Sequence, residues 1–261
     1  EFLNMSKKKK PYKINLFKEE HIMVSHKKIK EILKNWGLEN EKLTDVVYTE
    51  TGNVSESACY VGDDYIIKFS PNLGNVEKHI SLSQAIESVG LSTATPIKTA
   101  EGKFVVASEE LYFYVTKRLE GKQLKASTMY IEDYMPKARF IGEIVGQLSV
   151  ALSKVDVITN QANLFKSAKE WAIPALAGKM DLPKSFVEMY EKEFGEIYES
   201  LPQQIVHRDP NPGNIIICGD NWGVLDFDLS ERNIRIFDPC YAATAILSES
   251  FDADNTDKLN Q

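Results

Sequence analysis

The chain has 261 residues, of which 43% are hydrophobic and 26% are charged, a composition typical of a globular protein that can form one large domain or two lobes. Its 31 basic and 38 acidic side chains give a formal net charge of −7, so the chain as a whole does not attract nucleic acid or anionic lipid. Its apolar runs fall far short of the roughly 20 residues that a membrane span needs. We therefore expect neither a nucleic-acid partner nor a membrane.

The three cysteines are odd in number and widely separated, as Cys59, Cys218 and Cys240. This pattern favours neither a disulfide framework nor a zinc site and is typical of a reducing compartment, so we expect a cytoplasmic protein. Residues 1–4 resemble a cloning remnant, and the basic run Lys7–Lys10 is expected to be a solvated tail.

The first half of the chain predicts helices and a sheet in alternation. Apolar residues at helical spacing begin after Ser25 and predict a short helix that Gly37 ends. An antiparallel meander of three strands is predicted next, over Leu43–Thr49, Ser57–Val61 and Tyr65–Phe69. A helix and two more strands then follow, over Val76–Val89, Phe104–Ala107 and Leu111–Arg118.

Two features of the meander suggest that it binds an anion. Lys68 shares a strand face with Ile66, and a lysine among apolar neighbours is costly to desolvate without a phosphate or carboxylate partner; a solvated sheet face is the alternative. The turn over Glu50–Ser57 contains Gly52 and small hydroxyl residues, among them Ser55, which let backbone N–H groups approach a phosphate. Taken alone, this segment favours an ordinary hairpin turn over a phosphate-binding loop.

The second half predicts mostly helices. Amphipathic patterns cover Ala138–Val155 and Phe186–Leu201, and the segment between them, near Trp171 and Pro174, is also expected to be helical. The change in composition places a lobe boundary near Gly121.

The chemistry is concentrated between His207 and Asp228. His207-Arg208-Asp209 is followed five positions later by Asn214, and a predicted hairpin separates this loop from Asp226-Phe227-Asp228. Phosphoryl transfer requires a carboxylate to orient the acceptor hydroxyl, ligands for Mg²⁺ and cations for the nucleotide phosphates. Asp209, Asn214 and Asp226 supply the first two, and Lys68 supplies the third. The chain has neither a P-loop motif nor a dinucleotide-binding Gly-x-Gly-x-x-Gly motif.

These motifs resemble the signature of the protein-kinase-like superfamily, in its aminoglycoside phosphotransferase and choline kinase branch, over about Leu43 to Leu247. The resemblance implies an α+β, two-lobed, protein-kinase-like fold: a small antiparallel N-lobe sheet with one main helix and a mostly helical C-lobe. The implied division is a tail and helix over 1–40, a nucleotide-binding N-lobe over 41–120 and a catalytic, acceptor-binding C-lobe over 121–261.

The resemblance also implies roles for individual residues. Asp209 is expected to be the catalytic base, and Asn214 and Asp226 are expected to bind Mg²⁺. Lys68 is expected to hold the ATP phosphates with Glu77 as its partner, although the pattern leaves His79 and Glu87 open. The remaining nucleotide contacts are expected from Gly52, Ser55 and the adenine-binding hinge Lys117–Glu120, which includes Arg118 and Leu119.

Two positions distinguish this chain from eukaryotic-type protein kinases. Eukaryotic-type protein kinases usually carry Lys and Gly where this chain has Asn211 and Asp228, so the acceptor is expected to be a small metabolite. Arg208 departs from the small-molecule branch and is expected to pair with a nearby acid. His207 and Asp238 are expected to be structural. Downstream polar residues are compatible with an acceptor site or with a solvated loop, namely Glu231, Arg232, Asn233 and Arg235.

We therefore expect an ATP- and Mg²⁺-dependent kinase that phosphorylates a hydroxyl of an amino alcohol, amino sugar, aminoglycoside, homoserine-like compound or sugar. A protein kinase acting on Ser/Thr and a non-catalytic nucleotide-binding protein are the alternatives. The sequence stops soon after Asp228 with an acidic, polar stretch, which is compatible with a small acceptor wall or with a truncated acceptor site.

Overall fold

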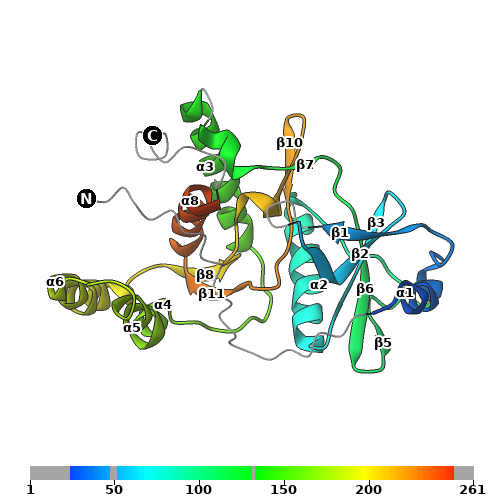
Figure 1. Cartoon of the computed structure of the whole chain (residues 1–261), viewed down its shortest axis with the longest axis horizontal. Coiled ribbons are helices and arrows are strands. Elements are labelled where there is room, and N and C mark those ends of the chain that lie inside the picture. Colours follow the sequence, from blue (N-terminus) through cyan, green and yellow to red (C-terminus); the bar gives the residue numbers. More distant parts are fainter. Residues whose placement is uncertain (1–23, 48–51, 131–132, 250–261) are drawn as a thin grey trace.

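The computed structural model describes residues 24–47, 52–130 and 133–249, and it consists of a sheet region followed by a mostly helical region (Figure 1). The basic run Lys7–Lys10, residues 1–4, the start of the Glu50–Ser57 turn and the acidic C-terminal stretch lie outside the described residues. The mixed α+β fold with an antiparallel sheet confirms the predicted fold class.

Helix α1 (His26–Leu33) forms where the apolar spacing predicted it. The Ser25 hydroxyl caps its first turn by accepting the backbone N–H of Lys28 at 3.3 Å. A 3₁₀ turn (Lys34–Trp36) follows, and Gly37 ends it with φ +70°, a left-handed conformation that glycine adopts without a steric cost.

The main sheet has five antiparallel strands. In spatial order they are β1 (Leu43–Val47), β2 (Val54–Val61), β3 (Tyr65–Ser70), β6 (Leu111–Lys117) and β5 (Val106–Ser108). The predicted meander and the two later strands are confirmed. One boundary was wrong, because β2 begins at Val54 and so includes Ser55, which was assigned to the turn. The run of small hydroxyl residues concealed a strand whose sequence has no regular apolar alternation.

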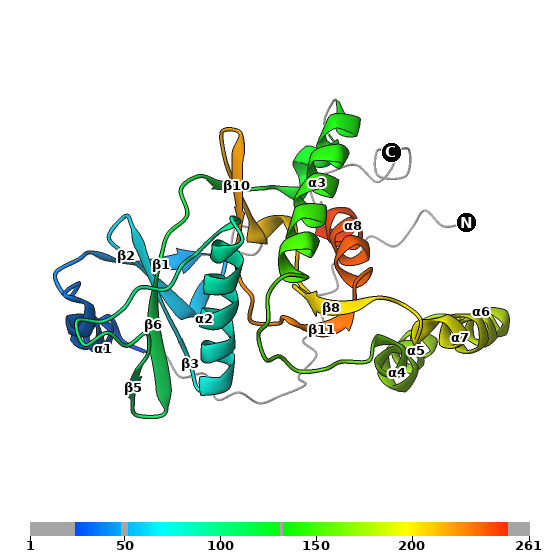
Figure 2. The same ribbon diagram turned by 180° about the vertical axis from the view of Figure 1, so that it is seen from behind.

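The two faces of this sheet pack against different helices, as both views show (Figures 1 and 2). Ile67 and its cross-strand neighbour Cys59 belong to one core with the buried side of α1. Lys68 and its neighbour Tyr114 lie on the opposite face, where Tyr114 packs against helix α2 (Leu73–Ser88). Alternation of side chains along each strand therefore separates an α1 face from an α2 face.

Helix α2 contributes to both halves of the molecule. Val76 and Ile80, in its first half, pack on Tyr114 of the sheet. Leu82 and Ile86, in its second half, are fully buried in a core with α3 (Tyr134–Leu152). The predicted stop is confirmed, because the helix ends before Gly90, whose φ is +89°.

The second half begins with the 3₁₀ turn Ala126–Tyr130 and ends with helix α8 (Phe237–Glu249), which packs against α3. The short strands are β4 (Ser92–Thr93), β7 (Lys122–Gln123), β8 (Gln203–Val206), β9 (Ile215–Cys218), β10 (Asn221–Val224) and β11 (Glu231–Ile234). They form one sheet in the order β4-β10-β9-β7 and a separate pair of β11 with β8. The hairpin predicted between Asn214 and Asp226 is β9 and β10.

The segment between α3 and β8 is helical, as predicted, and it projects away from the body of the protein (Figure 2). It contains α4 (Leu164–Ser167), α5 (Ile173–Ala177), α6 (Lys184–Met189) and α7 (Gly195–Tyr198), with π-helical turns over Ala168–Ala172 and Tyr190–Phe194. The expectation of one regular helix over Phe186–Leu201 was therefore wrong in detail. Aromatic side chains pack together within this segment, with the ring of Phe165 stacked on that of Tyr190.

The described residues bear on two expectations, one about disulfides and one about membrane spans. All three cysteines lie among them and all are free thiols. None of the helices within residues 24–47, 52–130 and 133–249 combines the length and the apolar character needed to cross a membrane.

Candidate active site

The loop after β8 is held by a buried histidine. His207 is fully buried, and its ring packs 4.9 Å from the ring of Phe227. Its Nε2 donates to the carbonyl of Leu225 at 2.8 Å, and its Nδ1 accepts the backbone N–H of Asp209 at 3.2 Å. The tautomer with its proton on Nε2 satisfies both contacts. The structural role expected of His207 is thereby confirmed.

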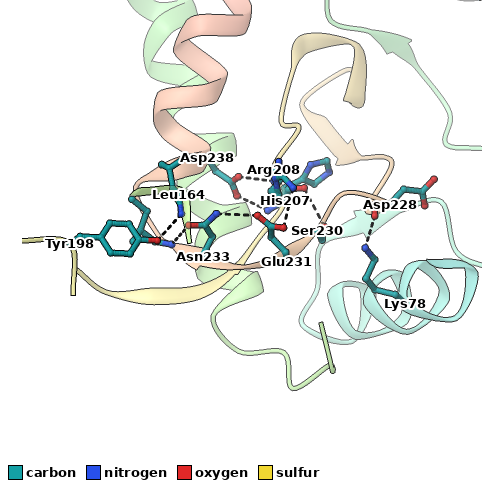
Figure 3. Close-up of polar contacts among 11 residues, drawn as sticks. Lys78, Leu164, Tyr198, His207, Arg208, Asp228, Ser230, Glu231, Asn233 and Asp238 are labelled. Carbon is teal, nitrogen blue, oxygen red and sulfur yellow. Dashed lines mark hydrogen bonds and ion pairs between the residues drawn. The ribbon is translucent and has the colours of Figure 1, made fainter. Parts of the chain in front are cut away.

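Asp238, at the start of α8, holds the same loop from the other side (Figure 3). Its carboxylate accepts the backbone N–H of His207 at 2.8 Å and that of Arg208 at 2.9 Å. The side chain is 1% exposed, so these two charge-assisted bonds replace water around a buried carboxylate. Arg208 has a left-handed φ of +72°, and the two bonds fix this turn of the backbone. The expectation that Asp238 is structural is confirmed.

The loop presents Asp209 with its carboxylate oriented by two amides. Asn211 donates from Nδ2 to Asp209 Oδ1 at 2.8 Å, and Asn214 donates from Nδ2 to Oδ2 at 3.1 Å. Asn211 also accepts the backbone N–H of Asn214 at 3.1 Å, which closes the short 3₁₀ turn Pro212–Asn214. Asp209 is therefore partly buried and fixed in direction, as a general base requires.

A cavity of about 210 Å³ lies between the sheet and this loop. Ser55 of β2 and Lys68 of β3 line it from the sheet, and Asn214, Asp226 and Asp228 line it from the second half of the chain. The structure thus brings the predicted cation, Lys68, together with both predicted metal ligands. At least 146 positions separate Lys68 from either ligand in the sequence (214 − 68 = 146). Asp226 has a left-handed φ of +65°, which turns the segment after β10 toward the cavity.

Helix α2 contributes His79, which the sequence left open as a partner of Lys68. His79 is 1% exposed, and its Nδ1 lies 2.8 Å from Asp228 Oδ1. Lys78, the residue before His79, also contacts Asp228, because its Nζ donates to the Asp228 backbone carbonyl (Figure 3). Partial burial raises the pKa of the Asp228 carboxyl, but the His79 hydrogen bond and the attraction of His79 and Lys68 outweigh it and hold this pKa well below its usual range.

The other predicted nucleotide residues take varied positions. Glu77 is exposed on α2, so its pairing with Lys68 stays a prediction. Gly52 has φ +68° and precedes β2. Lys117 and Arg118 are exposed and Leu119 is half-buried, and they line a different cavity from the one that contains Lys68. Their assignment to adenine also stays a prediction.

Arg208 has the acidic partner that was expected but not named. Its Nη1 lies 3.0 Å from Oε2 of Glu231, and Glu231 Oε1 accepts from Asn233 at 3.0 Å (Figure 3). Glu231 and Asn233 are buried on strand β11, whereas Arg232 and Arg235 are exposed. The solvated-loop alternative is therefore wrong for Glu231 and Asn233. Sequence pattern missed the strand because its polar side chains are buried through pairing with one another.

The donor set at the cavity suits a hard cation. Oδ atoms of Asp226 and Asp228 lie within 4.8 Å of one another and of a His79 nitrogen. Asn214 uses its amide nitrogen for Asp209, which leaves its amide oxygen available at the cavity wall. Carboxylate and amide oxygens are the ligands that Mg²⁺ prefers, so these residues fit a magnesium site. Asp228 adds a carboxylate to the two ligands proposed from the sequence.

Comparison with known proteins identifies the family to which this arrangement belongs. A sequence model of the phosphotransferase enzyme family, APH, matches residues 51–259, which is most of the chain. The chain belongs to this family. The match includes Lys68, Asp209, Asn214 and Asp226. No curated protein sequence matches the chain.

Solved structures share the fold of this phosphotransferase at low sequence identity. The GDP and kanamycin complex of APH(2")-IIia has a TM-score of 0.62 at 13% identity, over 90% of this chain and 86% of that one. Amicoumacin kinase hAmiN, in complex with AMP-PNP, Ca²⁺ and Ami, has a TM-score of 0.61 at 14% identity, over 89% and 74%. A choline/ethanolamine kinase family protein from Mesorhizobium loti has a TM-score of 0.56 at 14% identity, over 89% and 72%. At such identities the likeness shows that the fold is shared.

Proposed function

We propose that this phosphotransferase moves the γ-phosphoryl group of ATP to a hydroxyl group of a small polar molecule, with Mg²⁺ as its cofactor. The observation that carries the proposal is the convergence of Lys68, Asp209, Asn214, Asp226 and Asp228 on one cavity and the loop beside it. The AMP-PNP in the complex of hAmiN is consistent with ATP as the donor, and the GDP in the complex of APH(2")-IIia is consistent with a nucleotide donor.

Each residue has a part in the reaction that its surroundings explain. Asp209 accepts the proton of the acceptor hydroxyl as its oxygen bonds to the γ-phosphorus, while the bond from that phosphorus to the bridging oxygen breaks and ADP leaves. Lys68 holds the nucleotide phosphates on the sheet side. Asn214, Asp226 and Asp228 would hold Mg²⁺, which neutralises charge on the phosphate oxygens when bound.

A small acceptor is favoured by the way Arg208 is used. In the described residues its guanidinium is paired with Glu231 and lies over the ring of Phe237, 5.8 Å from the ring centre. Arg208, the residue that suggested a protein kinase, is thus already paired with the buried carboxylate of Glu231. Small hydroxyl compounds such as amino sugars, amino alcohols and aminoglycosides remain the acceptors that we propose, and the protein functions in the cytoplasm.

The test is ATP consumption by the purified protein with Mg²⁺ across a panel of hydroxyl metabolites and aminoglycosides. Asp209→Asn should retain ATP binding and lose roughly 10²- to 10⁴-fold in turnover, the usual contribution of a general base. Asp220→Asn is the matched control, because Asp220 is an exposed aspartate in the turn between β9 and β10. Undiminished turnover in Asp209→Asn, or phosphate appearing on proteins and on none of the small acceptors, would refute the proposal.

A further inference from the structure

A second group of metal-ligating side chains lies on the α1 face of the sheet, away from the cavity that contains Lys68. Nε2 of His26 is 3.0 Å from Oδ1 of Asp45 and 3.8 Å from Sγ of Cys59. The three ligand atoms all lie within 4.8 Å of one another. We propose that His26, Asp45 and Cys59 form a binding site for a zinc-like divalent cation.

The fold itself creates this arrangement. Asp45 of β1 and Cys59 of β2 are directly paired across the two strands, so their side chains leave the same face of the sheet a few ångströms apart. His26 is the first residue of α1, and the cap at Ser25 fixes that position. Ile29, one turn later, packs into the same core as Cys59, so α1 is anchored over this strand pair.

The two separations from His26 are close to those of a tetrahedral zinc site. With usual Zn–N, Zn–O and Zn–S bond lengths, ligand nitrogen lies about 3.3 Å from oxygen and about 3.5 Å from sulfur. The observed values of 3.0 Å and 3.8 Å require side-chain adjustments of only a few tenths of an ångström. His26 and Asp45 are each about half exposed, which leaves one side of the group open for a water as fourth ligand.

The chemistry of the donors selects the cation. A thiolate and an imidazole favour zinc or a related transition metal, whereas Mg²⁺ prefers oxygen ligands only. On binding, the Cys59 thiol would release its proton to solvent and its sulfur would bond to the metal. Both contacts of His26 use the same nitrogen, so the group cannot work as a Cys-His-Asp catalytic relay, in which the imidazole uses two nitrogens.

One nearby lysine is paired away from the group. Lys28, two residues after His26 on α1, lies 2.9 Å from a carboxylate oxygen of Glu109 at the β5–β6 turn. Since the α1 face and the α2 face of the sheet are separate, the proposed site and the catalytic cavity share no ligand. The proposal is therefore independent of the phosphotransferase reaction, and a bound cation would fasten α1 to the edge of the sheet.

Cobalt is the probe, because a cobalt–thiolate bond gives a charge-transfer absorption that oxygen ligands do not give. Untagged protein is titrated with Co²⁺ in excess Mg²⁺, which occupies oxygen-only sites, and Zn²⁺ is then added. We expect one Co²⁺ per chain with the thiolate band, loss of the band when Zn²⁺ is added, and a higher melting temperature with Zn²⁺. Cys59→Ala should abolish the band, and the control Cys218→Ser, at an exposed cysteine, should keep it.

His26→Gln and Asp45→Asn keep the proposal testable if Cys59→Ala unfolds, because both side chains are half exposed and fill no core position. Each should weaken Co²⁺ binding at least tenfold and reduce the Zn²⁺-dependent rise in melting temperature. Absence of the band in the wild type, or a band that depends on Cys218 and not on Cys59, would overturn the proposal. So would unchanged binding in both His26→Gln and Asp45→Asn.

Discussion

Replacement of Asp238 by asparagine tests how the catalytic loop is held. The carboxylate accepts two backbone N–H groups, from His207 and Arg208, at 2.8 and 2.9 Å. Asparagine has nearly the same shape, so no cavity forms, but it offers a single acceptor oxygen and an NH₂ group. One of the two backbone N–H groups therefore loses its acceptor and faces another donor.

The expected cost follows from these bonds. A hydrogen bond to a charged group contributes about 1.5–3 kcal/mol, and one of the two is lost while the other becomes a weaker neutral bond. Removal of the buried charge returns part of the desolvation cost. We therefore expect Asp238→Asn to lower the free energy of unfolding by about 2 kcal/mol. Turnover should also fall, because the loop that orients Asp209 is less firmly held.

Urea unfolding followed by circular dichroism measures the first effect, and ATP turnover with an identified acceptor measures the second. Asp220→Asn, an exposed aspartate, is the control in both assays and should change stability by less than about 0.5 kcal/mol. If Asp238→Asn is as stable and as active as this control, the two backbone bonds do not hold the loop and our account of Asp238 is wrong.

Three further predictions rest on single contacts. Lys68→Ala should lower kcat/KM for ATP roughly 10- to 100-fold, the effect of one lost charge-assisted bond to phosphate, and steady-state kinetics at varied ATP checks this. Arg208→Gly and Arg208→Ala lose the same ion pair, but only glycine adopts the φ of +72° without strain. In urea unfolding the glycine variant should therefore be more stable than the alanine variant by about 0.5–1 kcal/mol. An alanine variant of equal or greater stability contradicts this. Gly121→Ala places a Cβ against the backbone carbonyl oxygen of Ile217 and should cost at least about 2 kcal/mol in urea unfolding, whereas Gly219→Ala, where the space is open, should cost about 1 kcal/mol; equal losses would refute the clash.

Features encoded locally were predictable from the sequence. The period of apolar residues identified α1 and the strands beside Lys68, and the turn residues identified where they end. The spacing of Asp209, Asn214 and Asp226 identified the loop because those three residues lie close together in the chain. Local pattern is sufficient for elements whose hydrogen bonds lie within themselves or with their sequence neighbours.

Contacts between distant segments were not predictable in the same way. His79 faces Asp228 across 149 positions (228 − 79 = 149), and Arg208 finds Glu231 on a strand whose polar side chains look solvent-exposed in the sequence. The cysteines and histidines seemed scattered in the sequence, yet strand pairing places Cys59 beside Asp45, and the packing of α1 on the sheet brings His26 to both. Each of these contacts depends on which elements pack together, and the local pattern of residues along a sequence does not show this.

Because helix α2 packs in both halves of this enzyme, the halves are not separate modules. Its buried Leu82 and Ile86 belong to the core of the second half, while Val76 and Ile80 pack against the sheet of the first. A fragment that stopped at Gly121 would leave Leu82 and Ile86 in water, so the halves should unfold in one cooperative transition. A chimera that exchanged the sheet region between family members would need to bring a matching α3 surface with it.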